Sequence, residues 1–595
     1  MELSEDLRLA RRKLATLEGY ELLEDFSWDA VSDKWVLKFR IMCGTTTVFV
    51  PEITDWYLIA SPAYPLGKID IYPAAENGLA YTFPHQSYND LRPNAKWRTG
   101  NICVSTSVGL WGKRYFNNEP YDAESRLCWH ILRCKDWIAA AANGSLVVNG
   151  DPFEMPSFKK ESGQMFVFNE DEDTFTRWSE YKASYGTFTA KEVFANWPVY
   201  PILNFKSHAK EVQYKWGNRI NQSRAPEVTN LWVMLDKLPV LPPWQVPSTW
   251  GQLFSVVKEQ GIDLKGILKK DLFKAGKNSY KFLLVGFPIP RNVGEDNCRI
   301  FWLSISLPSA PSLSGFRRGS EALQSAQFKI MFKDEAVVKW ANTENWNKAE
   351  ITSRGKMNTS INNLRFVIIG AGAIGSNLSE LLLRLGCDNL TILDRDLLNI
   401  GNLSRHTLTM DKVHSCKVVS LAERLNSIFP SANVKPISKD LDHHFNSNAL
   451  MTLVQDTDIF IDATGDDTLI NFIGGLLSGT KAKFISVSTG FAAKRLFCFM
   501  ADTEQCSLEK EFTQALAPWL KKDEIENPDP QFPREGIGCW HPIFPARIDD
   551  IWLLLATAVK RIEKFLEAST VREFVVIEQE KDEEGYIMSV KIIED

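Results

Sequence analysis

The sequence predicts a multidomain protein that combines an α+β domain at its N-terminus with an α/β domain at its C-terminus, joined by a middle domain. Its 595 residues exceed what one hydrophobic core usually supports. From residue 363 onward, apolar strand-like runs alternate with glycine turns and amphipathic helices, which is typical of a doubly wound parallel sheet. We expect domains at residues 1–160, 161–350 and 351–595.

Residues 1–160 have the pattern of a compact α+β domain. Helical periodicity covers residues 6–23 and 124–142, and residues 35–42 and 56–60 are typical of strands. The middle part is rich in Trp, Phe and Pro and contains no repeat. The sequence assigns no chemistry to that middle part.

Composition excludes several classes of protein. A net charge of −6 gives no global attraction to nucleic acid or to anionic membranes. The N-terminus lacks the apolar stretch of a secretory signal, and no segment offers about 18 uninterrupted apolar residues for a membrane span. The ten cysteines include no CxxC pair, which argues against a disulfide framework or a four-cysteine zinc site. We expect a cytoplasmic protein in which individual thiols carry function.

A glycine turn marks a candidate nucleotide site. The apolar run 364–369 is followed at once by Gly370, Gly372 and Gly375 and by a helix to residue 385. Glycines in this pattern allow a tight turn and a close approach of phosphates, whose charge is met by the helix N-terminus. Asp394 ends the next strand, 390–393, where a carboxylate can accept hydrogen bonds from a ribose. At this point both NAD and ATP remain possible ligands.

Further polar and charged residues favour ATP, because Asn402, Arg405, Lys417 and Asp466 follow in a register that hydride transfer does not use. The register resembles the Rossmann-like adenylation domain of ubiquitin-activating enzymes and the bacterial ThiF and MoeB proteins. By that resemblance, Asp394 holds the ribose of ATP and Asp466 coordinates Mg²⁺. By the same resemblance, Asn402, Arg405 and Lys417 bind the phosphates. The chemistry agrees, since attack of a carboxylate on the α-phosphate brings two anions together and requires cations.

The sequence departs from that family at two points. His406 stands where the family usually has Gln, and Gly465-Asp466-Asp467 replaces the commoner Thr-Asp-Asn. Asp462 or Asp467 is therefore an alternative ligand for the metal.

Cys539 is the candidate acceptor of an activated acyl group. A thiol is nucleophilic near neutral pH, and a thioester retains energy for a later transfer. Cys539 lies in a glycine-bearing loop directly before an amphipathic helix, which is similar to the placement in activating enzymes that carry the cysteine in the adenylation domain. Cys498 and Cys506 are competing candidates.

Cys103 is a second candidate thiol. The stretch from Asn94 to Cys103, with Trp111 eight residues beyond, resembles the active-site region of ubiquitin-conjugating domains. The resemblance implies that Cys103 receives the acyl group from Cys539 and that Asn94 stabilises the oxyanion while a lysine amine attacks.

Two departures leave the oxyanion role open. Arg92 replaces the family's histidine, and Asn94 lies nine residues before the cysteine instead of eight. His85 or Asn101 could take the role instead. The alternative for Cys103 itself is a buried apolar thiol without a catalytic function.

The whole chain resembles the bacterial fusion of a ubiquitin-conjugating-like and a ubiquitin-activating-like domain found in CBASS antiphage operons. That resemblance implies a homodimer whose acyl substrate is the C-terminus of a cGAS-like nucleotidyltransferase, with no membrane and no direct nucleic-acid partner. Three alternatives stay open: activation of a sulfur-carrier protein, which would not need Cys103, an NAD-dependent oxidoreductase, and a scaffold with a degenerate nucleotide fold.

Overall fold

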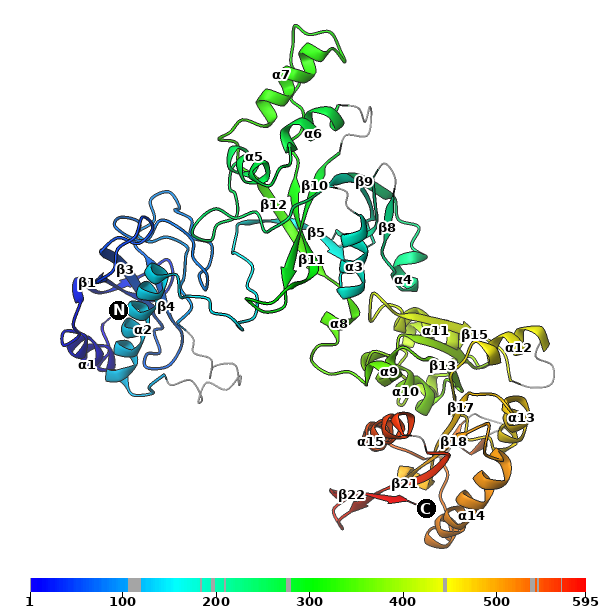
Figure 1. Ribbon diagram of the computed structural model, residues 1–595. Helices are drawn as coiled ribbons and strands as arrows, with labels where there is room; N and C mark the ends of the chain where they lie inside the picture. The colour runs from blue at the N-terminus through cyan, green and yellow to red at the C-terminus, as the bar shows by residue number, and fades with distance from the viewer. Residues whose placement is uncertain are drawn as a thin grey trace. The chain divides into compact units, whose positions relative to one another are not determined.

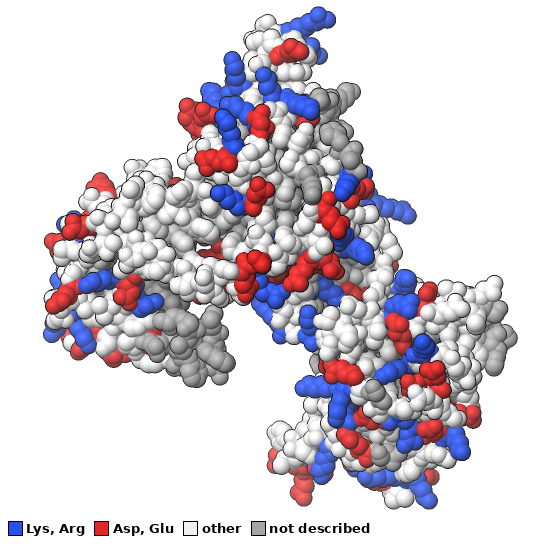
Figure 2. All heavy atoms as spheres, in the orientation of Figure 1, with Lys and Arg blue, Asp and Glu red and all other residues white. Residues whose placement is uncertain are grey.

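The computed structural model describes most of the chain and divides it into two compact units (Figure 1). The described residues are 2–104, 119–181, 184–193, 198–207, 210–273, 280–441, 447–535, 541–542, 545–568 and 570–594. The first unit comprises Met1–Tyr214 with Pro226–Asn345, and the second comprises Lys215–Ala225 with Trp346–Asp595. Among the described residues, no helix is long and apolar enough to cross a membrane. Acidic and basic side chains are interspersed over the visible surface (Figure 2).

The first unit begins with an antiparallel sheet of four strands that pair in sequence order. These strands are β1 (Tyr20–Asp29), β2 (Lys34–Met42), β3 (Ile53–Ala60) and β4 (Ile69–Pro73). Helices α1 (Glu5–Leu14) and α2 (Ala123–Asn143) pack against each other beside the sheet (Figure 1). The helix that we predicted over residues 6–23 is too long. It ends at Leu14 with Ala15 as its C-cap. Gly19, which has a left-handed φ of 74°, comes directly before β1, and its carbonyl accepts the N–H of Met42.

Helix α2 closes the core of this sheet. Asp122 caps its start by accepting the N–H of Ser125, and Gly144 ends it in the left-handed conformation. Its inward face carries Ile131 and Trp137 into one hydrophobic cluster with strand residues such as Trp56. The helix predicted over 124–142 is thus confirmed, and it forms one side of the thiol pocket described below.

A second sheet of the first unit closes into a ring. Its order is β5-β12-β11-β10-β9-β6-β7-β8. An additional parallel pairing of β5 with β7 closes the ring, and β8 pairs with β7. The strands are β5 (Lys160–Phe168), β6 (Tyr185–Lys191), β7 (Val199–Lys206), β8 (Glu211–Gln213), β9 (Glu227–Met234), β10 (Phe282–Pro290), β11 (Asn297–Ser306) and β12 (Lys339–Asn345). The helices are α3 (Glu172–Tyr181), α5 (Trp250–Glu259), α6 (Leu264–Asp271) and α7 (Glu321–Met331).

The second unit is built on a mixed sheet of eight strands with helices on both faces. Its order is β15-β14-β13-β16-β17-β18-β21-β22. The predicted parallel arrangement is present from β15 to β17, whereas β18, β21 and β22 pair antiparallel. The strands are β13 (Arg365–Ile369), β14 (Asn389–Leu393), β15 (Asn433–Ile437), β16 (Ile459–Asp462), β17 (Lys483–Thr489), β18 (Arg495–Asp502), β21 (Arg572–Lys581) and β22 (Ile587–Glu594); β19 (Arg534–Glu535) and β20 (His541–Pro542) form a separate pair.

Alternate residues of β13 point into two different cores, as the period of a strand requires. Phe366 and Ile368 belong to a cluster with α10, α11 and α15, while Val367 and Ile369 belong to a cluster with α12, α13 and α14. The helices of this unit are α4 (Asn218–Asn221), α8 (Lys348–Ile351), α9 (Thr359–Asn362), α10 (Ala373–Arg384), α11 (Lys417–Leu425), α12 (Ser447–Gln455), α13 (Asp467–Leu477), α14 (Leu508–Glu526) and α15 (Ile548–Glu567).

Candidate active sites

A pocket of about 760 Å³ opens where the parallel strands β13, β14 and β16 end. Ligands of open α/β sheets bind at this carboxyl edge. Five of the residues that the sequence predicts to bind nucleotide line the pocket together: Gly370, Gly372, Asp394, Lys417 and Asp466.

The glycine turn has the geometry that a phosphate site requires. Gly370 has a left-handed φ of 91°, and a Cβ atom on Gly375 would lie 1.8 Å from the carbonyl oxygen of Gly370. Gly375 is therefore needed for close packing of α10 beneath the turn, although it does not line the pocket. Gly372 stands at the start of α10, and a Cβ atom there would meet nothing within 4 Å. Open space beside a helix N-terminus fits an anion.

Asp394 and His406 hold the turn from two sides. The Oδ2 atom of Asp394 accepts the N–H of Ala371 at 2.7 Å, and its Oδ1 atom accepts the N–H of Asp396 at 2.7 Å. His406 is buried, and its Nδ1 atom accepts the N–H of Leu408 at 3.0 Å. The proton is therefore on Nε2, which donates to the carbonyl of Ala371 at 2.7 Å. Burial lowers the pKa of His406, so the family's glutamine is replaced here by a neutral imidazole.

Cations line the same pocket. Lys417 opens α11, and its Nζ atom lies 3.0 Å from Oδ2 of Asp396. Lys439, after β15, is a further pocket residue that sequence reasoning missed, because no motif marks it. Asn402 and Arg405 do not line the pocket. The Oδ1 atom of Asn402 accepts the N–H of Asn399 at 3.0 Å, and the carbonyl of Arg405 accepts from Asn377. Their contacts with phosphates stay predictions.

The three aspartates proposed for the metal differ in position. Asp462 is buried and accepts hydrogen bonds from Thr464 and Ser486, and burial raises its pKa. Burial and the neighbouring Asp466 raise the pKa of Asp467, which does not line the pocket. Asp466 does line it, and caps α13 by accepting the N–H of Thr468 at 2.9 Å.

The described residues contain no cluster of three metal-ligating side chains. Mg²⁺ in nucleotide sites is usually held by one or two carboxylates together with substrate phosphates. The carboxylate of Asp466, which lines this pocket, therefore fits that ion.

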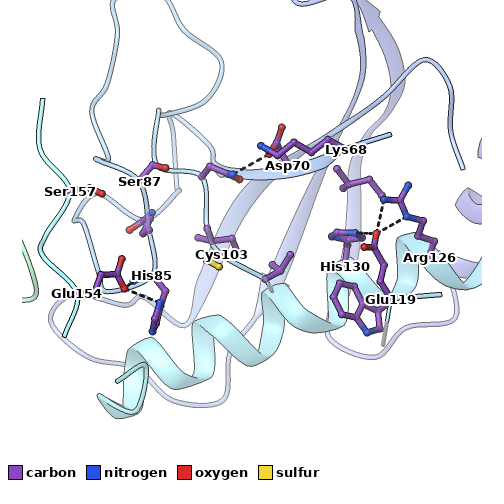
Figure 3. A pocket seen from close by; sticks show the side chains of 16 residues that line it. Lys68, Asp70, His85, Ser87, Cys103, Glu119, Arg126, His130, Glu154 and Ser157 are labelled. Atoms are coloured by element: carbon purple, nitrogen blue, oxygen red, sulfur yellow. Dashed lines mark hydrogen bonds and ion pairs between the residues drawn. The ribbon is translucent and has the colours of Figure 1, made fainter. Parts of the chain in front are cut away.

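Cys103 lies in a second pocket, of about 520 Å³, in the N-terminal part of the first unit (Figure 3). It is the one cysteine among the described residues whose side chain is exposed, so it is not the buried apolar thiol of the alternative interpretation. Of the three residues considered for an oxyanion role, His85 and Asn101 line the pocket. Asn94 does not; it is exposed in a turn with a left-handed φ of 58°.

The polar walls of the Cys103 pocket are well ordered by hydrogen bonds. The N–H of Cys103 donates to the carbonyl of His85 at 2.8 Å, and Asn101 donates from Nδ2 to Asp70 at 3.1 Å. On another wall, Glu119 pairs with Arg126 and His130 (Figure 3). Burial opposes ionisation of Glu119, but hydrogen bonds and charge from His130 and Arg126 prevail and lower its pKa to about 2. The sequence carried no signal for Glu119.

The remaining thiols differ from Cys103. Burial raises the pKa of Cys498 and of Cys506 to about 12, with Glu511 adding to the shift at Cys506. Cys387 is buried, with its pKa likewise raised to about 12. Thiols with such pKa values are poor nucleophiles near neutral pH. Cys539 and Trp111 lie outside the described residues.

Two family models match adjoining parts of this chain. The family model of the Cap2 central linker domain matches residues 144–346, starting at the glycine that caps α2, and the ThiF family model matches residues 347–507. The ATP-dependent ubiquitin transferase-like protein Cap2 of Enterobacter hormaechei is 30% identical over 562 residues, which cover 91% of each chain.

Relatives of the C-terminal part match over shorter stretches. The molybdopterin-synthase adenylyltransferase of Escherichia coli is 31% identical over 20% of this chain and 48% of its own. The crystal structure of E. coli MccB with ATP is 17% identical, with a TM-score of 0.27 over 40% of this chain and 64% of that chain, a likeness too low to support a conclusion. The full-length match decides the assignment: this chain belongs to the family of Cap2 ubiquitin transferase-like proteins and contains a ThiF-type adenylyltransferase domain.

Proposed function

We propose that this chain uses ATP and Mg²⁺ to activate the C-terminal carboxyl group of a protein, and conjugates that protein to a lysine amine through thioesters at Cys539 and Cys103. One observation carries the proposal. The same chain contains a glycine-turn pocket with Asp394, Lys417 and Asp466 and a polar pocket with an exposed thiol, Cys103.

The residues of the glycine-turn pocket have distinct tasks in the proposed reaction. The substrate carboxylate attacks the α-phosphate of ATP, an acyl adenylate forms, and pyrophosphate leaves. Asp394 holds the ribose, Asn402 binds a phosphate, and the N-terminus of α10, Lys417 and Arg405 offset the phosphate charge. Asp466 would hold Mg²⁺, which neutralises charge on the departing pyrophosphate.

Two transfers of the acyl group to cysteine thiols follow. The thiolate of Cys539 attacks the acyl carbonyl, and AMP leaves. The thiolate of Cys103 then takes the acyl group from Cys539, and a lysine amine attacks the Cys103 thioester to form an amide and restore the thiol. Support for Cys539 comes from the alternatives, because burial holds the pKa values of Cys498 and Cys506 far above neutrality. By position, Asn101 suits the oxyanion role better than Asn94 does, because Asn101 lines the Cys103 pocket and Asn94 does not.

Membership of the Cap2 family supports the remaining assignments. We propose that the acyl substrate is a cGAS-like nucleotidyltransferase, that the chain acts as a homodimer in the cytoplasm, and that the system belongs to CBASS antiphage defence.

Intact-mass analysis of the chain with ATP and the candidate nucleotidyltransferase, with and without reductant, tests this proposal. The Asp466→Ala chain should form no adenylate, the Cys539→Ala chain an adenylate but no thioester, and the Cys103→Ala chain a thioester on Cys539 alone. Equal conjugation by the Cys103→Ala chain would contradict the relay. Pyrophosphate exchange without any Cys103 thioester would instead favour activation of a sulfur carrier.

A further inference from the structure

His85 and Glu154 form a hydrogen-bonded pair at the Cys103 pocket. The Nδ1 atom of His85 lies 2.9 Å from Oε2 of Glu154, and the same oxygen accepts the backbone N–H of His85 at 3.3 Å. Both residues line the pocket, and Figure 3 shows the pair on one side of Cys103, opposite the cluster of Glu119, Arg126 and His130. Glu154 follows α2 and lies in the stretch that matches the Cap2 central linker domain.

The backbone fixes His85 relative to the thiol. The N–H of Cys103 donates to the carbonyl of His85 at 2.8 Å. Gln86, which follows His85, and Ile102, which precedes Cys103, form an antiparallel bridge. His85 also adopts a left-handed φ of 55°. A residue other than glycine is held in that region at a cost, and such residues cluster at functional sites. The two hydrogen bonds to Glu154 help to hold this conformation.

The pair has the arrangement of a base and its orienting carboxylate. When Nδ1–H donates to Glu154, the lone pair is on Nε2, which is then available to take a proton. Histidine is the side chain that most often acts as a general base. The other carboxylates of the pocket are engaged, since Asp70 pairs with Lys68 at 2.6 Å and with Asn101, and Glu119 pairs with Arg126 and His130.

We propose that His85 is the general base for attack of the lysine amine on the Cys103 thioester, and that Glu154 is a positioning residue which the linker domain supplies to this site. The amine nitrogen forms a bond to the acyl carbon, a proton passes from that nitrogen to Nε2 of His85, and the carbon–sulfur bond breaks to release the Cys103 thiolate. The inference rests on the proposed conjugation reaction.

The test separates this step from ATP-dependent activation. In a Cys539→Ala chain, Cys103 is loaded by exchange with a synthetic peptide thioester that ends in glycine, and its discharge to free lysine is followed by intact mass. His85→Gly removes the imidazole, and glycine accepts the left-handed φ without strain. We expect discharge to slow by about 100-fold, the scale of general-base catalysis, and added imidazole to restore part of the rate.

Glu154→Gln should slow discharge by about tenfold, the scale of losing an orienting partner. Glu124→Gln, an exposed carboxylate on α2, is the matched control and should discharge at the unaltered rate. Unaltered discharge by the His85→Gly chain, or a loss that imidazole does not restore, would overturn the assignment of His85. Unaltered discharge by Glu154→Gln would overturn that of Glu154. Because loading needs no ATP, failure of ATP-dependent loading bears only on the proposed function.

Discussion

The Nζ atom of Lys417 lies 3.0 Å from the carboxylate of Asp396 at the wall of the glycine-turn pocket. Only 9% of the Lys417 side chain is exposed, whereas the partner carboxylate is largely in solvent. The charge of Lys417 is therefore held at the first residue of α11, beside the space that phosphates would occupy.

Replacement of Lys417 should slow adenylate formation. We expect ATP–pyrophosphate exchange by the Lys417→Ala chain to fall about 100-fold or more, because a preorganised cation stabilises the charge that develops during transfer. Lys412→Ala is the control, since Lys412 pairs with Glu423 at the surface and does not line the pocket. Equal exchange by both variants would contradict a phosphate role for Lys417.

Gly372 and Gly375 should fail in different ways when changed to alanine. A Cβ atom on Gly375 would lie 1.8 Å from the carbonyl of Gly370, so Gly375→Ala should lower the melting temperature and weaken ATP binding. A Cβ atom on Gly372 would meet no protein atom within 4 Å, so the Gly372→Ala chain should unfold like the parent chain. Bound phosphates, however, would meet the new methyl group. We expect ATP to raise its melting temperature less than that of the parent.

The measurement for both glycine variants is thermal unfolding with and without ATP. Gly475→Ala, in α13 with open space around the position, serves as the control and should keep the full shift by ATP. A normal ATP shift in the Gly372→Ala chain would rule out the close approach of phosphates to this residue.

Glu170 should make the middle domain less stable as the pH rises. Burial raises the pKa of Glu170 to about 7 from an ordinary 4.5, although Thr174, Trp178, Trp302 and Tyr214 all donate hydrogen bonds to it. Between about pH 4.5 and 7 the folded chain keeps a proton that the unfolded chain has lost. Stability should therefore decline through that window by about 3 kcal/mol and stay level above it.

Glu170→Gln should remove most of that decline, because an amide oxygen can still accept the indole hydrogen bonds and carries no charge. Urea unfolding followed by tryptophan fluorescence measures the effect, since Trp178 and Trp302 contact Glu170 directly. Glu180→Gln, an exposed change on α3, the helix that follows Glu170 in the chain, should leave the pH dependence as it is. A decline of the same size in the Glu170→Gln chain would show that other groups cause it.

Thiol labelling should follow exposure. N-ethylmaleimide added to the folded chain should modify Cys103 long before Cys134 or Cys498, because both of these are fully buried and their pKa values are raised. Peptide mass mapping after timed quenching measures the order. Cys498 should react at the rate of Cys103 only after denaturation, and comparable rates in the folded chain would contradict the described core.

Local pattern was enough to predict the nucleotide half of the protein. Three short-range features of the sequence predict it: the apolar run before Gly370, the spacing of the glycines, and the aspartate at the end of the next strand. The structure confirms the strand, the turn and the helix.

Tertiary structure decided the rest, because the deciding contacts join residues far apart in the sequence. The ring of the middle domain depends on the pairing of β5 with β7, which no local pattern encodes. The position of Asn94 outside the thiol pocket, and of His85 within it, follows from how the loop before Cys103 folds back on itself. Glu154 reaches the same pocket from beyond α2, and only packing could bring that carboxylate to His85.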